Sequence, residues 1–107
     1  MRTLEHPDRN SISLDGVLFA LSDPTRRKIV RQLADGPPAQ YCSQFALPIS
    51  LSTQTHHFRV LREAGVIEQR YQGTAIVAAL RSEDLTTRVP GLLEAILAAE
   101  RAENPPN

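Results

Sequence analysis

Between Ser50 and Gly65 the chain carries hydroxyl, amide, imidazole and guanidinium side chains within one short stretch. Such groups can bond to the edges of base pairs in the DNA major groove, and an arginine can also bind phosphate. A catalytic site would instead need a nucleophile or a pair of carboxylates held in a pocket. The candidate DNA-contacting residues of this stretch are Ser52, Thr53, Gln54, Thr55, His56, Arg59 and Arg62.

An α-helix is the element that would present these side chains together. Ser52 is a good N-cap, because its hydroxyl can accept a hydrogen bond from a free backbone N–H of the first turn. Gly65 is a good end, since glycine takes the left-handed C′ conformation at little cost. At about 100° per residue, Phe58, Leu61 and Ala64 fall on one side and can pack on a core. The polar side carries Ser52, Thr55, His56, Arg59 and Glu63, and we expect Thr53 and Gln54 to be exposed at the leading end.

The whole chain has the size and composition of one globular domain. It has 107 residues, and 41% of them are hydrophobic, which is enough to bury a core. We expect a flexible arm over residues 1–12, the folded domain over residues 13–103 and a disordered tail over residues 104–107. No apolar run is as long as a membrane span or a signal-peptide core, and the lone Cys42 suits a reducing compartment. These features predict a cytoplasmic protein without a membrane partner.

Charge is balanced overall but unevenly distributed along the chain. Residues 24–81 carry eight arginine or lysine side chains and three acids, whereas both flanking segments are acidic. A basic centre between acidic ends is typical of a module that touches phosphate with its centre only. An ordinary solvated surface with uneven charge is the plain alternative.

Capping signals predict two helices ahead of the polar stretch. Ser13 or Asp15 can cap a helix from about Leu14 to Ser22. Asp23 followed by proline predicts a second helix over Pro24–Ala34, because proline at the first helical position loses no hydrogen bond. We expect the positive surface of this helix to come from Arg26, Arg27, Lys28 and Arg31.

The segment between the second helix and the polar helix is predicted to contain a short helix and a turn. Ala39–Ala46 can form the short helix, with Tyr41, Cys42 and Phe45 facing inward. Leu47–Ile49 is a turn, because a proline disfavours helix at the residue before it. Short helix, turn and capped polar helix together predict a helix-turn-helix.

After Gly65 the pattern changes to short runs rich in β-branched residues. Residues 66–71 and 74–80 read as two strands joined at Gln72-Gly73, which is the hairpin wing of a winged helix. Arg70 lies near the tip and is a further candidate for phosphate or minor-groove contact, although a solvated edge charge is an equal alternative. The predicted fold class is therefore mainly α-helical with a small β-hairpin wing.

The first and last helices carry more apolar residues than one buried face requires. Ser82 opens a capped turn, and a final helix follows from Leu92 to about Ala102. The surplus apolar surface predicts a homodimer formed through the first and last helices, whereas burial in the chain's own core is the alternative. The candidate interface residues are Leu14, Val17, Leu18, Leu21, Leu92, Leu93, Ile96 and Leu97.

Two blocks of the sequence resemble the ArsR-type bacterial transcription regulators (ArsR/SmtB). Residues 20–29, ALSDPTRRKI, resemble the first conserved block of that family, and residues 52–67, STQTHHFRVLREAGVI, resemble its recognition helix and the entry to its wing. The resemblance covers about residues 14–81. It implies a winged-helix homodimer that binds a pseudo-palindromic operator on double-stranded DNA.

The residues depart from the metal sites known in that family. The arsenic and cadmium type uses a Cys-x-Cys pair before the recognition helix, where this chain has only Cys42. The zinc and nickel type uses Asp and His on the last helix, which here has no histidine. We therefore expect no metal and no cofactor. His57 is predicted to be a hydrogen-bonded structural residue, and Cys42 is either a redox sensor or, more ordinarily, a small buried hydrophobe.

The leading hypothesis is a dimeric, sequence-specific DNA-binding regulator, with repression as the family habit. A second hypothesis assigns the sensing to a separate effector-binding partner protein, because no ligand site is evident in the residues. A third is a winged-helix protein-interaction module that does not bind DNA. An enzyme is not expected, since no nucleophile–base–orienter set or phosphate-binding glycine loop is present.

Overall fold

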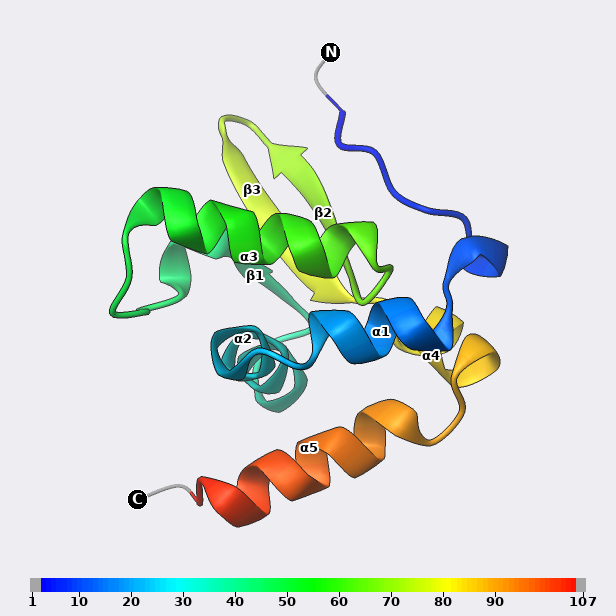
Figure 1. The fold of residues 1–107 in the computed structure, drawn as a ribbon. Coiled ribbons are helices and arrows are strands. Elements are labelled where there is room, and N and C mark those ends of the chain that lie inside the picture. The colour runs from blue at the N-terminus through cyan, green and yellow to red at the C-terminus, as the bar shows by residue number, and fades with distance from the viewer. Residues whose placement is uncertain (1–2, 106–107) are drawn as a thin grey trace.

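Five α-helices and a three-stranded antiparallel sheet make up residues 3–105, the part of the chain that this computed structural model describes (Figure 1). In chain order the elements are α1 Leu14–Ala20, α2 Pro24–Asp35, β1 Ala39–Tyr41, α3 Leu51–Glu63, β2 Ile67–Gln72, β3 Ala75–Leu80, α4 Ser82–Arg88 and α5 Leu92–Glu103. Short 3₁₀ turns, η1 Arg9–Ser11 and η2 Cys42–Gln44, precede α1 and follow β1. The sheet and its wing lie away from α5, with α1, α2 and α3 between them (Figure 1).

The starts of α1 and α2 follow the capping signals in the sequence. The Ser13 side chain accepts a hydrogen bond from the backbone N–H of Gly16, and Asp23 accepts one from Arg26. These bonds satisfy donors that the first turn of a helix leaves free. The predictions of α1, α2 and α5 are confirmed, although α1 ends two residues earlier than expected and α2 one residue later. Ser82 does not cap α4: the N-cap position is Arg81, whose side chain makes no capping hydrogen bond.

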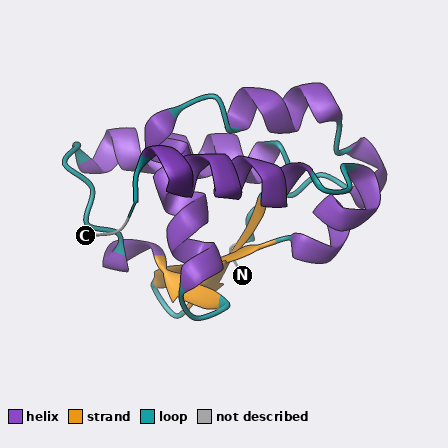
Figure 2. Ribbon diagram, turned by 90° about the horizontal axis from the view of Figure 1, so that it is seen from below, coloured by secondary structure: helices purple, strands orange, loops and turns teal. Residues whose placement is uncertain are grey.

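The wing is an antiparallel hairpin, as predicted, with a register that pairs Ile67 with Leu80 and Gln72 with Ala75. Its turn lies one residue later than expected, at Gly73 and Thr74, where Gly73 takes a φ of +66°. The strand order β1-β3-β2 leaves β2 at one edge of the sheet. Figure 2 shows the strands gathered on one side of the helices.

The prediction of a helix over Ala39–Ala46 is wrong. Residues 39–41 form β1, which pairs with β3 and adds a third strand to the wing. Gln40 is buried there, and its amide donates to the backbone carbonyls of Gln32 and Pro37. Residues 39–41 thus form backbone hydrogen bonds with the edge of β3, which they could not form as a helix. Phe45 is buried as expected, Cys42 is half-buried and Tyr41 is exposed.

The segment ahead of α1 is attached to the domain over its described part. Ile12, at the end of the predicted arm, is 2% exposed and belongs to the core. The His6 ring accepts a hydrogen bond from the backbone N–H of Gln69, so the arm runs along the free edge of β2. Arg81 bonds the carbonyl of Pro7, and Arg9 pairs with Asp84 at 2.6 Å. These two arginines hold the pKa of the Asp84 carboxyl below its usual value.

Candidate nucleic-acid interface

The polar helix α3 begins two residues earlier than predicted. Its N-cap is Ser50, whose hydroxyl accepts a hydrogen bond from the backbone N–H of Thr53. Ser52, the predicted cap, instead lies within the first turn and is exposed. Gly65 ends the helix as expected and has a φ of +83°. Its backbone N–H donates to the carbonyl of Arg62, and the N–H of Val66 donates to the carbonyl of Leu61. That pair of bonds is a Schellman motif.

One face of α3 presents hydrogen-bonding side chains to solvent. Thr55, His56 and Arg59 follow one another along this face, and Arg59 Nη2 lies 3.3 Å from His56 Nδ1. Phe58 and Leu61 on the opposite face are buried. The exposed polar residues are Ser52, Thr53, Thr55, His56, Arg59 and Glu63.

Gln54 does not lie on the exposed face, which corrects the expectation from the sequence. Its side chain is among the buried polar groups, with 9% of the residue exposed. The amide Nε2 donates to the backbone carbonyl of Cys42 at 3.1 Å and so ties α3 to η2. A side chain held in this way is a structural link within the helix-turn-helix rather than a group available to a base.

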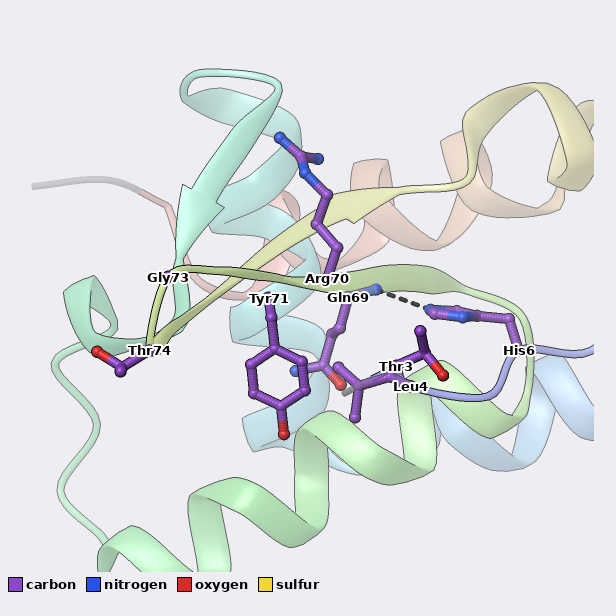
Figure 3. A pocket seen from close by; sticks show the side chains of 8 residues that line it. All are labelled: Thr3, Leu4, His6, Gln69, Arg70, Tyr71, Gly73 and Thr74. Atoms are coloured by element: carbon purple, nitrogen blue, oxygen red, sulfur yellow. Dashed lines mark hydrogen bonds between the residues drawn. The ribbon is translucent and has the colours of Figure 1, made fainter. Parts of the chain in front are cut away.

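The two remaining candidate arginines differ in their surroundings. Arg62 is half-buried, and its Nη1 donates to Gln69 Oε1 on β2 at 2.6 Å, so it joins α3 to the wing. Arg70 is exposed and points away from the face of β2 that carries Gln69 and Tyr71 (Figure 3). The Arg70 guanidinium extends from the wing (Figure 3), whereas the Arg62 guanidinium is held between α3 and β2.

Most of the basic side chains expected to form a positive surface on α2 are instead engaged in contacts within the domain. Arg26 is 8% exposed and donates to the carbonyls of Ala20 and Phe19 at the end of α1. Arg27 pairs with the buried Glu100 of α5 at 2.8 Å, and this bond holds the pKa of the Glu100 carboxyl below its usual value. Arg31 bonds the carbonyl of Asn104. Lys28 is the member of the group that is exposed.

His57 is a hydrogen-bonded structural residue, as predicted. Its Nδ1 lies 3.2 Å from Arg26 Nη1 and 3.8 Å from the Asp23 carboxylate. Because Arg26 also caps the end of α1, this contact links α1 and the start of α2 to the inner side of α3. The sequence of residues 23–28 predicts a helix start and a positive surface and contributes to the family resemblance, but it does not by itself indicate this contact.

Cys42, the first residue of η2, is a half-buried free thiol that accepts a hydrogen bond from Gln69 of β2. Burial raises the pKa of the thiol, while a hydrogen bond from the Gln69 amide at 3.4 Å lowers it to a smaller extent. A thiol with a raised pKa holds less of the reactive thiolate, so its surroundings favour a packing role. Its redox activity stays a prediction.

The apolar residues assigned to a dimer interface divide into two groups. Val17, Leu21, Leu93 and Leu97 are buried in the core of the chain itself. Leu92 and Ile96 of α5 are half-buried, whereas Leu14 and Leu18 of α1 are 53% and 45% exposed. Phe19, 65% exposed, was not among the candidates, although its place next to Leu18 could have suggested it.

Comparison with known proteins agrees with this geometry. A helix-turn-helix domain family matches residues 21–70. The uncharacterised HTH-type transcriptional regulator YceK of Bacillus subtilis is 32% identical over 82 residues, which are 75% of this chain and 82% of that protein. The transcriptional repressor SdpR of the same organism is 31% identical over 83 residues, which are 78% and 92% of the two chains. A crystal structure of the ArsR-family transcriptional regulator RHA00566 is 28% identical and covers 88% of this chain and 98% of its own, with a TM-score of 0.63.

The chain belongs to the ArsR-type winged helix-turn-helix transcription regulators. In ArsR-family terms, α3 is the recognition helix, and β2 and β3 form the wing. The chain is thus a transcription regulator with a helix-turn-helix DNA-binding domain, and its relatives are regulators rather than enzymes. Within residues 3–105, no helix is long and apolar enough to cross a membrane.

Proposed function

We propose that this ArsR-family member is a repressor that binds a pseudo-palindromic operator as a homodimer. The exposed polar face of α3 is the observation that carries the proposal, because its side chains are those that read base edges. The proposed base and nearby phosphate contacts are Ser52, Thr53, Thr55, His56 and Arg59, with Arg70 as a positioning charge. Gln54 leaves this set because of its burial, and Arg62 is primarily a link between α3 and the wing.

Repression is proposed from the relatives, of which SdpR is named as a transcriptional repressor. A dimer is proposed from the apolar surface of α1, which the single chain leaves exposed. In a twofold dimer, two copies of α3 would enter successive major grooves about one helical turn of DNA apart. The alternative of a protein-interaction module predicts no salt-dependent binding to duplex DNA.

Removal of the Arg70 side chain is expected to weaken DNA binding evenly across sequences. Arg70→Ala should lower the affinity for specific and scrambled duplexes by similar factors and reduce the slope of log K against log salt by about 0.9 per protomer, the share of one phosphate contact. Fluorescence anisotropy at several salt concentrations measures both quantities. Arg101→Ala is the matched control, because Arg101 is an arginine on α5 paired with Asp35. A flat salt dependence of the wild-type protein would contradict DNA binding as its function.

Substitutions at Gln54 and Thr55 are expected to have different effects: the first should lower stability, and the second should weaken base recognition. Gln54→Ala should cost about 1–3 kcal/mol of unfolding free energy, because the Cys42 carbonyl loses its donor, and should leave base preference unchanged. Thr55→Ala, on the exposed face, should change stability little but lose about 1–3 kcal/mol of discrimination between specific and scrambled DNA. Denaturant unfolding and competition binding below the unfolding range measure the two effects. If only Gln54→Ala lost discrimination between specific and scrambled DNA, Gln54 rather than Thr55 would be the base-contacting residue.

A further inference from the structure

A cavity of about 370 Å³ lies between the recognition helix and the wing. Its apolar lining consists of Leu51 and Phe58 of α3, Ile76 of β3, the ring of Tyr71 of β2 and Leu4 of the arm. The cavity therefore touches the two elements proposed to contact DNA. A cavity of this volume has room for a small organic molecule.

The charged groups at this cavity are all positive. Arg59 and Arg62 line it, and among the described residues that line it there is no carboxylate. Arg62 Nη1 donates to Gln69, but Arg62 Nε is buried and has no hydrogen-bond partner among residues 3–105. A buried donor without a partner is costly and is rare in native proteins. The Arg62 guanidinium is therefore not fully satisfied by the described residues, and a carboxylate or similar anion in the cavity would offer it a further acceptor.

A second cavity, of about 650 Å³, shares Leu4, Gln69 and Tyr71 with the first, and Figure 3 shows the side chains that line it. It is bounded by the arm and the outer part of the wing, and Arg70 is its only lining guanidinium among the described residues. Figure 3 shows that Arg70 points away from α3, whereas Gln69 and Tyr71 point toward it. The cationic groups thus gather at the smaller cavity, which makes it the better anion site.

We propose that the cavity between α3 and the wing binds a small amphipathic organic anion, whose charged group pairs with Arg62 and whose apolar part lies against Phe58 and Tyr71. Occupancy would lower the affinity for operator DNA. The anion competes with Gln69 for Arg62 and so loosens the link between α3 and β2. It also places negative charge near Arg59, where a phosphate would otherwise bind. The effect on DNA rests on the proposed function, whereas ligand binding itself does not.

The first test uses 4-phenylbutyrate and its neutral amide as probes, since both have twelve non-hydrogen atoms and differ in charge. Titration of the full chain without DNA, followed by two-dimensional amide NMR, should show binding of the acid with shifts centred on residues of α3, β2 and β3 around the cavity. The amide should bind at least fivefold more weakly. Equal binding of acid and amide, no binding of the acid at 10 mM, or shifts centred elsewhere would overturn the proposal.

Variants locate the site. Arg62→Gln should bring acid and amide to within about twofold of each other, and Ile76→Phe, which fills the cavity, should weaken both by at least fivefold. Arg101→Gln is the matched control and should behave as the wild-type protein does. Unchanged selectivity in a folded Arg62→Gln together with unchanged affinity in Ile76→Phe would exclude this cavity.

The DNA measurement distinguishes failure of this proposal from failure of the proposed function. Saturating 4-phenylbutyrate should raise the dissociation constant for operator DNA at least fivefold, while the amide at equal concentration should not. If the free protein binds operator and the bound acid leaves that affinity unchanged, the regulatory part of the proposal is wrong and the proposed function stands. If the free protein binds no duplex but binds the acid selectively, the proposed function fails and the anion site stands.

Discussion

Gly65→Ala should lower the free energy of unfolding by about 2–5 kcal/mol, one of the two largest effects expected in this chain. Gly65 lies at the exit of the recognition helix with a φ of +83°, where a side chain strains the backbone by about 1–2 kcal/mol. A Cβ there would meet Ile12 Cγ1 at 2.5 Å and Cδ1 at 2.7 Å. Because Ile12 is 2% exposed, its side chain has little room to move, and overpacking of this kind adds about 1–3 kcal/mol.

Gly73→Ala provides the matched control for backbone strain. Gly73 also has a positive φ, of +66°, but a Cβ there would meet no described atom within 4 Å. This substitution should therefore cost only about 1–2 kcal/mol. Urea unfolding of both variants measures the difference, with equal m values showing that compactness is unchanged. Equal losses of unfolding free energy in the two variants would mean that the clash between the new methyl group at position 65 and Ile12 adds no cost beyond backbone strain.

Gly65 also illustrates what the sequence could predict about the fold. Local signals such as Asp23-Pro24 and Gly65 predicted helix boundaries well, because caps and glycine stops act within a few residues. The local pattern of residues 39–46 does not reveal β1, because the strand at residues 39–41 depends on pairing with β3, almost forty residues later. Ile12 was assigned to the arm for a similar reason, since its packing partner Gly65 is distant in sequence.

Within the candidate site, the helical period was a better guide than residue type. Gln54 is four residues before Phe58, and residues at this spacing share a face, so the period places it on the buried side. Its polar amide suggested a base contact, but a polar side chain can also be buried when it has a partner such as the Cys42 carbonyl. The bond between Gln54 and Cys42, like the ion pair between Arg27 and Glu100, depends on tertiary contacts. The local sequence pattern therefore does not predict it.

Leu18→Glu should convert the proposed dimer into a folded monomer and weaken operator binding by about 100-fold or more. Leu18 and Phe19 are 45% and 65% exposed on α1, so a charge at position 18 should cost the single chain little. At a buried dimer interface the same charge would lack a partner, which is strongly unfavourable. The loss of DNA affinity follows because two linked half-site contacts typically gain 10²–10⁴-fold over one.

Leu18→Lys separates loss of the dimer from electrostatic repulsion of DNA. A glutamate repels phosphate and a lysine attracts it, so repulsion would predict opposite effects, whereas loss of the dimer predicts weak binding in both variants. Light scattering at micromolar concentration gives the oligomeric state, and anisotropy on a duplex selected by the wild-type protein gives the affinity. Two dimeric variants would place the interface elsewhere. Two monomeric variants with wild-type affinity would show that α3 and the wing of one chain suffice, and that the exposed apolar surface of α1 serves something other than operator recognition.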